Sequence, residues 1–385
     1  MKAVVAIDSF KGCLSSAEAN RAAAEGIRRV CADAEVVQVA VSDGGEGFVE
    51  AFRSATGGKE VEVTVADPLL RPVAATYLLS GQTAVIEIAK ASGLTLLASH
   101  ERNPMTATSY GTGQMVADAV SKGARHIIVG LGGSATSDAG TGMLRALVDI
   151  FAPHGKWKDI AALEGIRFTI ATDVSNPLCG KNGAASVFGP QKGATPYMTR
   201  LLDSRARRFA EASARYFGYD RSEDEGAGAA GGLGYAFMQY LNAERRSGIE
   251  LLLEAIDFRK TAKNTDFIVT GEGSADRQTL MGKLPTGILT HSPAVPVCLI
   301  AGQVSDRDKL LAAGFASVEC INPPSLPLTT AMQKSIATQN IEQTAARLAS
   351  YYMSEGADEV KREGAEKRVY TAEKEKRKIM GCSKN

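Results

Sequence analysis

Acidic residues in this sequence recur beside glycines or turn residues where short apolar runs end. These acids are Asp8, Asp43 with Glu46, Asp138, Asp173, and Glu272 with Asp276. Cationic side chains occur close to several of the same loops, at Lys11, Lys192, Arg277 and Lys283. Carboxylates can hold Mg²⁺, and glycine amides together with lysine can hold phosphate oxygens. This combination is typical of phosphoryl transfer, which depends on positioning and on neutralising charge.

The densest pattern of this kind lies in residues 264–287. Its apolar run, 267–269, predicts a buried strand. The next residues, 270–273, contain two glycines, and we expect them to end the strand in a flexible turn. Asp276 and Lys283 follow, which completes the set that a phosphate and metal site needs. The alternative is a solvated loop whose charges face water.

Composition limits the classes of function. A chain of 385 residues predicts two or three domains, and 44% hydrophobic content allows a substantial core. The net charge of +1 gives no general attraction to nucleic acid or to a membrane surface. Six cysteines without a C-x-x-C pair and four scattered histidines argue against zinc and favour a reduced, cytoplasmic setting. No apolar run reaches the ~18 residues of a membrane helix.

Strand-like and helix-like segments alternate over most of the chain. We expect strands at 3–7, 35–41, 61–65, 73–79, 84–88, 126–131, 167–171, 267–269, 295–301 and 316–321. Helices are expected at 15–30, 114–121, 196–216 and 339–352, and the charged residues 355–385 are expected to form a solvated helix or a frayed tail. This alternation predicts an α/β fold with parallel sheets, in which ligands lie at the carboxyl ends of the strands.

Two glycine-rich loops have different predicted roles. The loop 132–140 follows a strand and opens a helix, so its amides are expected where the helix dipole favours an anion. The loop 226–234 contains a formal G-x-G-x-x-G, but charged residues 220–225 precede it where a dinucleotide site needs a strand. We therefore favour a loop whose backbone approaches a ligand or a neighbouring helix. An NAD-dependent oxidoreductase using Gly226–Gly231 stays an alternative.

Seven blocks, in the same order, resemble the bacterial glycerate kinases of type 1. They are residues 8–12, 42–47, 132–138, 173–178, 188–194, 226–234 and 270–287. The likeness runs from residue 1 to about 352. Ser137 and Ala139 depart from the family, which usually has Asn and Gly there. Residues 150–163 look shorter than expected, and the tail after 352 is not a family feature.

The resemblance implies ATP- and Mg²⁺-dependent phosphorylation of D-glycerate, in most such enzymes to 2-phosphoglycerate. It also implies a Rossmann- or flavodoxin-like domain built from both chain ends, 1–62 and 291–385. A second α/β domain, 63–290, would be inserted, with the active site in the cleft between the two. Phosphorylation to 3-phosphoglycerate and a non-catalytic binding module stay alternatives. The sequence also leaves open whether the chain forms a homodimer.

Individual roles follow as hypotheses. We expect Asp173 and Asp276 to contact Mg²⁺ or to accept the proton of the substrate hydroxyl, with Asp8, Asp43 and Glu272 supporting them or doing the same work. Lys283 and Lys11 are expected to contact phosphate oxygens or the glycerate carboxylate. The further residues expected to bind substrate or cofactor are Glu46, Arg71, Ser134, Asp138, Gly228, Gly231 and Arg277.

Overall fold

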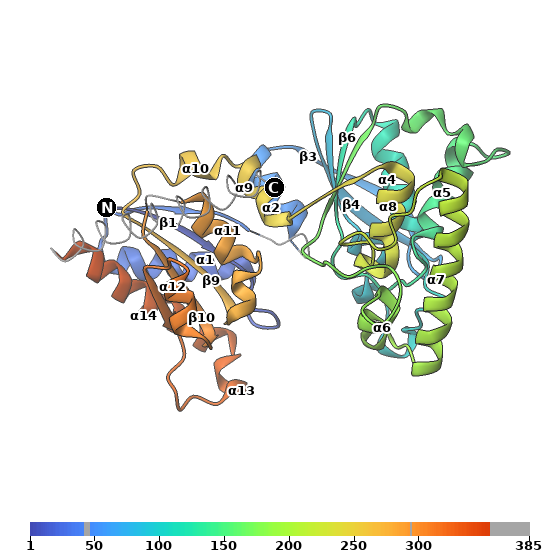
Figure 1. Ribbon diagram of the computed structural model, residues 1–385. Coiled ribbons are helices and arrows are strands. Elements are labelled where there is room, and N and C mark those ends of the chain that lie inside the picture. Colours follow the sequence, from blue (N-terminus) through green and yellow to red (C-terminus); the bar gives the residue numbers. More distant parts are fainter. Residues whose placement is uncertain (42–46, 293–294, 355–385) are drawn as a thin grey trace, which may run out of the picture. The chain divides into compact units, whose positions relative to one another are not determined.

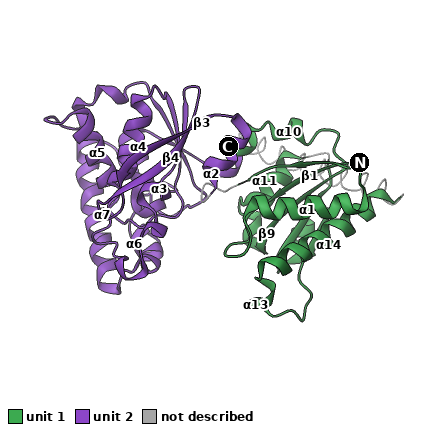
Figure 2. Ribbon diagram, turned by 180° about the vertical axis from the view of Figure 1, so that it is seen from behind, with its two compact units in different colours: residues 1–42, 252–385 green, residues 43–251 purple. Residues whose placement is uncertain are grey.

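The computed structural model of the chain describes residues 1–41, 47–292 and 295–354 (Figure 1). The chain divides into two compact units, Met1–Ser42 with Leu252–Asn385 as unit 1 and Asp43–Leu251 as unit 2 (Figure 2). The domain bounds that the family resemblance implies, 62/63 and 290/291, stay a prediction. Within the described ranges, no helix has the length and apolar character needed to cross a membrane.

Unit 1 contains a five-stranded sheet in which every neighbouring pair of strands is parallel. Its strands are β1 (Lys2–Ile7), β2 (Glu35–Gln38), β9 (Phe267–Ala275), β10 (Val297–Val304) and β11 (Ser317–Cys320). Their spatial order is β2-β1-β9-β10-β11. Counted along unit 1 this order is 2-1-3-4-5, the flavodoxin-like arrangement. The predicted α/β class with a parallel, flavodoxin-like sheet is confirmed.

Helices cover both faces of this sheet. The helices α1 (Ser16–Val30) and α14 (Lys334–Met353) share one buried cluster with β1, β9 and β10. The predicted capping box is present: Ser15 and Glu18 bond each other's backbone at the start of α1. On the other side α11 (Leu284–His291) contacts β1, β9 and β10. The shorter helices are α10 (Phe258–Thr261), α12 (Arg307–Ala312) and α13 (Leu328–Ala331).

Strand β9 is longer than the sequence pattern predicts. It continues through Gly271 and Gly273 to Ala275, because β10 pairs with it as far as that residue. The predicted turn at these glycines is therefore wrong. Gly271 has a different purpose: an added Cβ would lie 2.4 Å from the carbonyl oxygen of Ile300. Glycine here permits close strand packing and not a turn.

Unit 2 contains a six-stranded sheet in which spatial order equals chain order. Its strands are β3 (Lys59–Ala66), β4 (Pro72–Ser80), β5 (Thr83–Glu87), β6 (His126–Gly130), β7 (Arg167–Ala171) and β8 (Glu244–Arg246). The pairs β3–β4 and β4–β5 are antiparallel, and the pairs from β5 to β8 are parallel. The carboxyl ends of β5, β6, β7 and β8 therefore meet at one edge, as the sequence predicts for its acidic and glycine-rich loops.

A second buried cluster, separate from that of unit 1, joins this sheet to the helices α3 (Ala89–Ser92), α4 (Tyr110–Ser121), α5 (Thr141–Phe151), α7 (Pro196–Phe217) and α8 (Leu233–Leu241). The helix α2 (Phe48–Thr56) contacts β4 and β5, and α6 (Ala184–Phe188) contacts α7. The helix α9 (Gly248–Ala255) runs across the division between the units. Each unit has its own buried core, so the helices and strands of a unit are held in place by packing within that unit.

Candidate active site

Two of the predicted acids meet at the point where the strand order of unit 1 reverses. The amide of Asp8 donates to the carbonyl oxygen of Gly271 at 2.9 Å, continuing the register that pairs Ile7 with Gly271. Asp8 and Glu272 are therefore neighbours at the carboxyl ends of β1 and β9. Ligands of open α/β sheets bind outside the carboxyl ends of the strands at this kind of position.

Glu272 is nearly buried, with 8% of its surface exposed, and both of its oxygens are used. Oε2 accepts from Lys283 Nζ at 2.9 Å, and Oε1 accepts from Thr279 Oγ1 at 2.7 Å. The side chain of Lys283 stays 40% exposed. Lys283 thus compensates a buried carboxylate while part of its side chain stays open to solvent.

The turn after β9 ties these groups together. Asp276 caps a 3₁₀ helix, Arg277–Leu280, by accepting from the amide of Gln278 at 2.7 Å. Its own amide donates to Thr279 Oγ1 at 3.0 Å, and the same hydroxyl donates to Glu272. Thr279 therefore links Asp276 to Glu272, a role that sequence reasoning missed. We call Asp8, Glu272, Asp276, Thr279 and Lys283 the switch-point cluster.

Lys11 lies in the loop beside this cluster. Its side chain is exposed, and its backbone nitrogen is 4.0 Å from where a Cβ of Gly273 would stand. Arg277 is also exposed, in the turn directly after Asp276. The structure thus brings Asp8, Lys11, Glu272, Asp276 and Lys283 to one edge of one sheet. Asp43 and Glu46, predicted for the same edge, fall outside the described residues.

In unit 2, the predicted loop after β6 is held from two sides. The amide of Leu94 donates to Gly133 O and the amide of Ala135 donates to Ser92 O, both at 2.8 Å. On its other side, the amide of Ala139 donates to Gly231 O at 3.0 Å. Because these bonds flank the residues between them, the loop is well fixed in place.

Asp138 proves to be a cap for two helices. Its Oδ2 accepts from the amide and hydroxyl of Ser109, at 2.9 and 2.8 Å, just before α4. The same carboxylate accepts from the amides of Gly140 at 3.1 Å and Gly142 at 3.2 Å at the start of α5. The amides predicted to receive an anion at the start of α5 thus already have one, the carboxylate of Asp138. Its expected contact with substrate stays a prediction.

We expect Asp138→Ala to lower the free energy of unfolding by roughly 2–4 kcal/mol, because it removes a charged cap and leaves several donors without acceptors. A thermal melt measures the loss. Asp149→Ala is the matched control, since Asp149 contacts only the side chains of Arg145 and Tyr110 among the described residues and caps no helix. Equal melting temperatures for the two variants would contradict the capping role.

Glycines of the loop 226–234 pack closely against the backbone of other segments. An added Cβ at Gly228 would lie 2.3 Å from Pro177 O, and one at Gly231 would lie 1.9 Å from Thr136 O. Gly231 also has a φ of +69°. The preceding described residues, 218–225, form turns after α7 and no strand. The dinucleotide interpretation therefore fails, and these glycines are accounted for by packing; their expected contact with a ligand stays a prediction.

Lys192, one of the cations that the sequence places beside the acidic loops, is buried in unit 2. It follows Gly189–Gln191 in a short 3₁₀ turn, and only 2% of its surface is exposed. Its Nζ donates to Ser134 Oγ at 2.8 Å and to Thr136 O at 2.7 Å. Burial lowers the pKa of Lys192 to about 7, against an opposing effect of Asp138. A lone lysine between glycines was the available signal.

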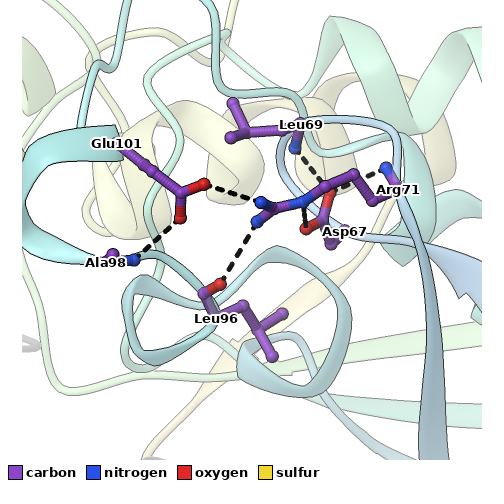
Figure 3. Close-up of polar contacts among 6 residues, drawn as sticks. All are labelled: Asp67, Leu69, Arg71, Leu96, Ala98 and Glu101. Atoms are coloured by element: carbon purple, nitrogen blue, oxygen red, sulfur yellow. Dashed lines mark hydrogen bonds and ion pairs between the residues drawn. The ribbon is translucent and has the colours of Figure 1, made fainter.

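Two further predicted residues lie elsewhere in unit 2. Asp173 is exposed just after β7, at the carboxyl edge of the sheet. Arg71 is engaged by two acids: Nε contacts Asp67 Oδ2 at 2.6 Å and a terminal nitrogen contacts Glu101 Oε1 at 2.7 Å (Figure 3). These two ion pairs hold the Arg71 side chain at the turn between β3 and β4. Its expected contact with a substrate carboxylate stays a prediction.

Carboxylates are among the ligands that Mg²⁺ prefers, and the switch-point cluster of unit 1 carries them at Asp8 and Asp276. Within the described residues no three His, Cys, Asp or Glu side chains gather closely enough to hold a metal by themselves. Mg²⁺ in kinases is usually held by one or two carboxylates with substrate phosphates and water. The carboxylates of the switch-point cluster are of the kind that such an ion takes, and the expected contacts of Asp173 and Asp276 with Mg²⁺ stay predictions.

Comparison with known proteins decides the family. The sequence model of the glycerate kinase family matches residues 3–353. The chain belongs to the glycerate kinase family. It is 39% identical over 373 residues to glycerate kinase of Bacillus subtilis (strain 168), covering 91% of this chain and 97% of that protein. The family resemblance expected from the sequence is confirmed.

Two further relatives of the glycerate kinase family support this placement. Glycerate 2-kinase of Escherichia coli (strain K12) is 40% identical over 334 residues, covering 80% of this chain and 86% of that protein. A crystal structure from Salmonella typhimurium LT2, described as a glycerate kinase 2, superposes with a TM-score of 0.75 at 38% identity. The match covers 91% of this chain and 97% of the other. The matched residues, 3–353, thus include segments of both units.

Proposed function

We propose that this protein transfers the γ-phosphoryl group of ATP to a hydroxyl of D-glycerate and yields 2-phosphoglycerate. The observation that carries the proposal is the family match over nearly all of the described chain. The switch-point cluster supports it with a phosphoryl-transfer set of acids and a lysine at the expected edge of a flavodoxin-like sheet. Relatives named glycerate kinase and glycerate 2-kinase support the choice of substrate.

In the proposed reaction, the glycerate hydroxyl oxygen forms a bond to the γ-phosphorus, and the bond from that phosphorus to the bridging oxygen of ADP breaks. The hydroxyl proton passes to a carboxylate, for which Asp276 and Asp173 are the candidates. Lys283 and Lys11 would bind phosphate oxygens or the glycerate carboxylate, because the side chain of Lys11 is exposed and that of Lys283 is 40% exposed. Bound Mg²⁺ would neutralise charge on the nucleotide, with Asp276 or Asp173 holding it.

Thr279 and Glu272 have a positioning role in this proposal. The hydroxyl of Thr279 bridges the amide of Asp276 and the carboxylate of Glu272, so it fixes the turn on which Asp276 stands. Glu272 in turn orients Lys283. The predicted location of the substrates between the two units stays a prediction.

Phosphorus NMR of the product formed from ATP, Mg²⁺ and D-glycerate tests the function. We expect ADP together with a phosphomonoester whose phosphorus couples to the single proton on carbon 2. Coupling to two protons would identify 3-phosphoglycerate and correct the position of transfer. No ADP release above a reaction without glycerate would overturn the proposal.

A further inference from the structure

In unit 2, the ammonium group of Lys192 forms no ion pair with a carboxylate of the described residues. It is buried, and its two bonded acceptors, Ser134 Oγ and Thr136 O, are both neutral. An ammonium has three N–H donors, and hydrogen bonds within the described residues use two. Asp138 opposes the pKa shift of Lys192, but its own hydrogen bonds go to the starts of α4 and α5. Burying an uncompensated charge is costly.

Other polar groups on the same loop also lack partners. The hydroxyls of Thr136 and Ser137 are buried, and within the described chain neither has a hydrogen-bond partner. The amides of Gly132 and Gly133 take part in no hydrogen bond among the described residues. The loop is nevertheless fixed by its bonds to residues 92–94 and to Gly231. The loop is thus fixed, carries donors that no described residue uses, and contacts the buried ammonium group of Lys192. These are the properties of a site for an anionic group.

Arg102 lies on the other side of the turn that carries Lys192. An added Cβ at Gly193 would lie 2.4 Å from Arg102 O, and Arg102 Nε is buried without a partner in the described chain. The backbone of Arg102 therefore contacts this turn, and its buried Nε is a further donor that no described residue accepts from.

We propose that Lys192 is a positioning residue that holds the loop 132–137 ready for an anionic group of one substrate. Lys192 acts through Ser134 and Thr136, since its buried side chain leaves contact with the ligand to the loop. The ligand chemistry is a set of anionic oxygens, either the phosphates of ATP or the carboxylate of glycerate. The inference rests on the proposed function, of which it names one binding element.

The test compares Lys192→Met with wild type in steady-state kinetics, varying ATP and D-glycerate separately. Methionine keeps the length of the side chain and removes its charge and donors. We expect the KM of one substrate to rise at least tenfold, the KM of the other to stay within twofold and kcat to stay within about threefold. The substrate whose KM rises is the one that the loop 132–137 binds.

Ser134→Ala removes one of the two acceptors and serves as the second variant. It is expected to raise the KM of the same substrate, and the double variant is expected to show less than the product of the two effects, because both changes break one contact. Lys181→Met is the matched control, because Lys181 is an exposed lysine of the same unit. We expect it to leave both KM values and kcat unchanged.

A purely architectural role would give a different result. Partial unfolding lowers the concentration of active enzyme, so the apparent kcat would fall while both KM values stayed the same. That result, or unchanged kinetics in a folded Lys192→Met protein, would overturn the inference. An inactive wild-type enzyme would instead overturn the proposed function, so the two failures are distinguishable.

Discussion

Lys283→Met is expected to lower kcat/KM for D-glycerate phosphorylation by about 100-fold or more, in a protein that stays folded. Loss of one charged contact to a developing phosphoryl group typically costs about 3 kcal/mol of transition-state stabilisation. Lys283 is placed for such a contact. Glu272 fixes its ammonium group, and 40% of the Lys283 side chain is exposed. Steady-state kinetics with a parallel thermal melt measures the effect.

An alternative role for Lys283 is to neutralise Glu272 and nothing more. The double variant Glu272→Gln/Lys283→Met separates the roles, because it removes the buried charge together with its partner. We expect the double variant to regain thermal stability and to remain poorly active. Recovery of activity to within threefold of wild type would show that Lys283 serves only its ion pair. Lys309→Met is the matched control, since Lys309 pairs with Asp306 on the surface of the same unit.

Gly231→Ala is expected to destabilise unit 2 by at least about 3 kcal/mol. The new Cβ would lie 1.9 Å from Thr136 O, and φ is +69°, a conformation that costs an L-residue roughly 1–2 kcal/mol even in open space. The neighbouring loop is itself fixed, so the backbone has little freedom to move away. Urea denaturation measures the loss of free energy.

The control separates backbone strain from steric overlap. Gly123 has a φ of +93° with nothing within 4 Å of an added Cβ, so Gly123→Ala keeps the strain and lacks the overlap. We expect Gly123→Ala to cost only the 1–2 kcal/mol of strain. Hydrogen exchange should locate the Gly231→Ala effect in peptides of β6 and β7, with β1 and β10 protected as in wild type. Equal costs for both variants would refute the steric argument.

Much of the fold follows from local pattern. Helix α1 begins at its Ser15 cap, and β6 and β7 lie where apolar runs end in glycine or acid. The family blocks also led to the correct class. These features are encoded by residues close to one another in the chain, so a sequence is sufficient to read them.

The misreadings concern contacts between distant residues. Nothing near Gly271 indicates that β10 continues pairing along β9, so the strand was predicted to stop early. Burial likewise has no local signal. The sequence marks Lys192 and Glu272 as charges beside turns, and only the fold shows that both are buried, Lys192 against neutral acceptors and Glu272 against a lysine and a threonine.

The insertion of unit 2 between β2 and β9 has a consequence for biosynthesis. The ribosome releases β1 first, yet its neighbour β9 emerges only after all of residues 43–251. Unit 2 pairs its strands in chain order, so it can finish folding while the amino-terminal strand still has an unpaired edge. During that interval β1 is exposed to aggregation and to chaperones. Translation speed through residues 252–304 should therefore affect the yield of native enzyme.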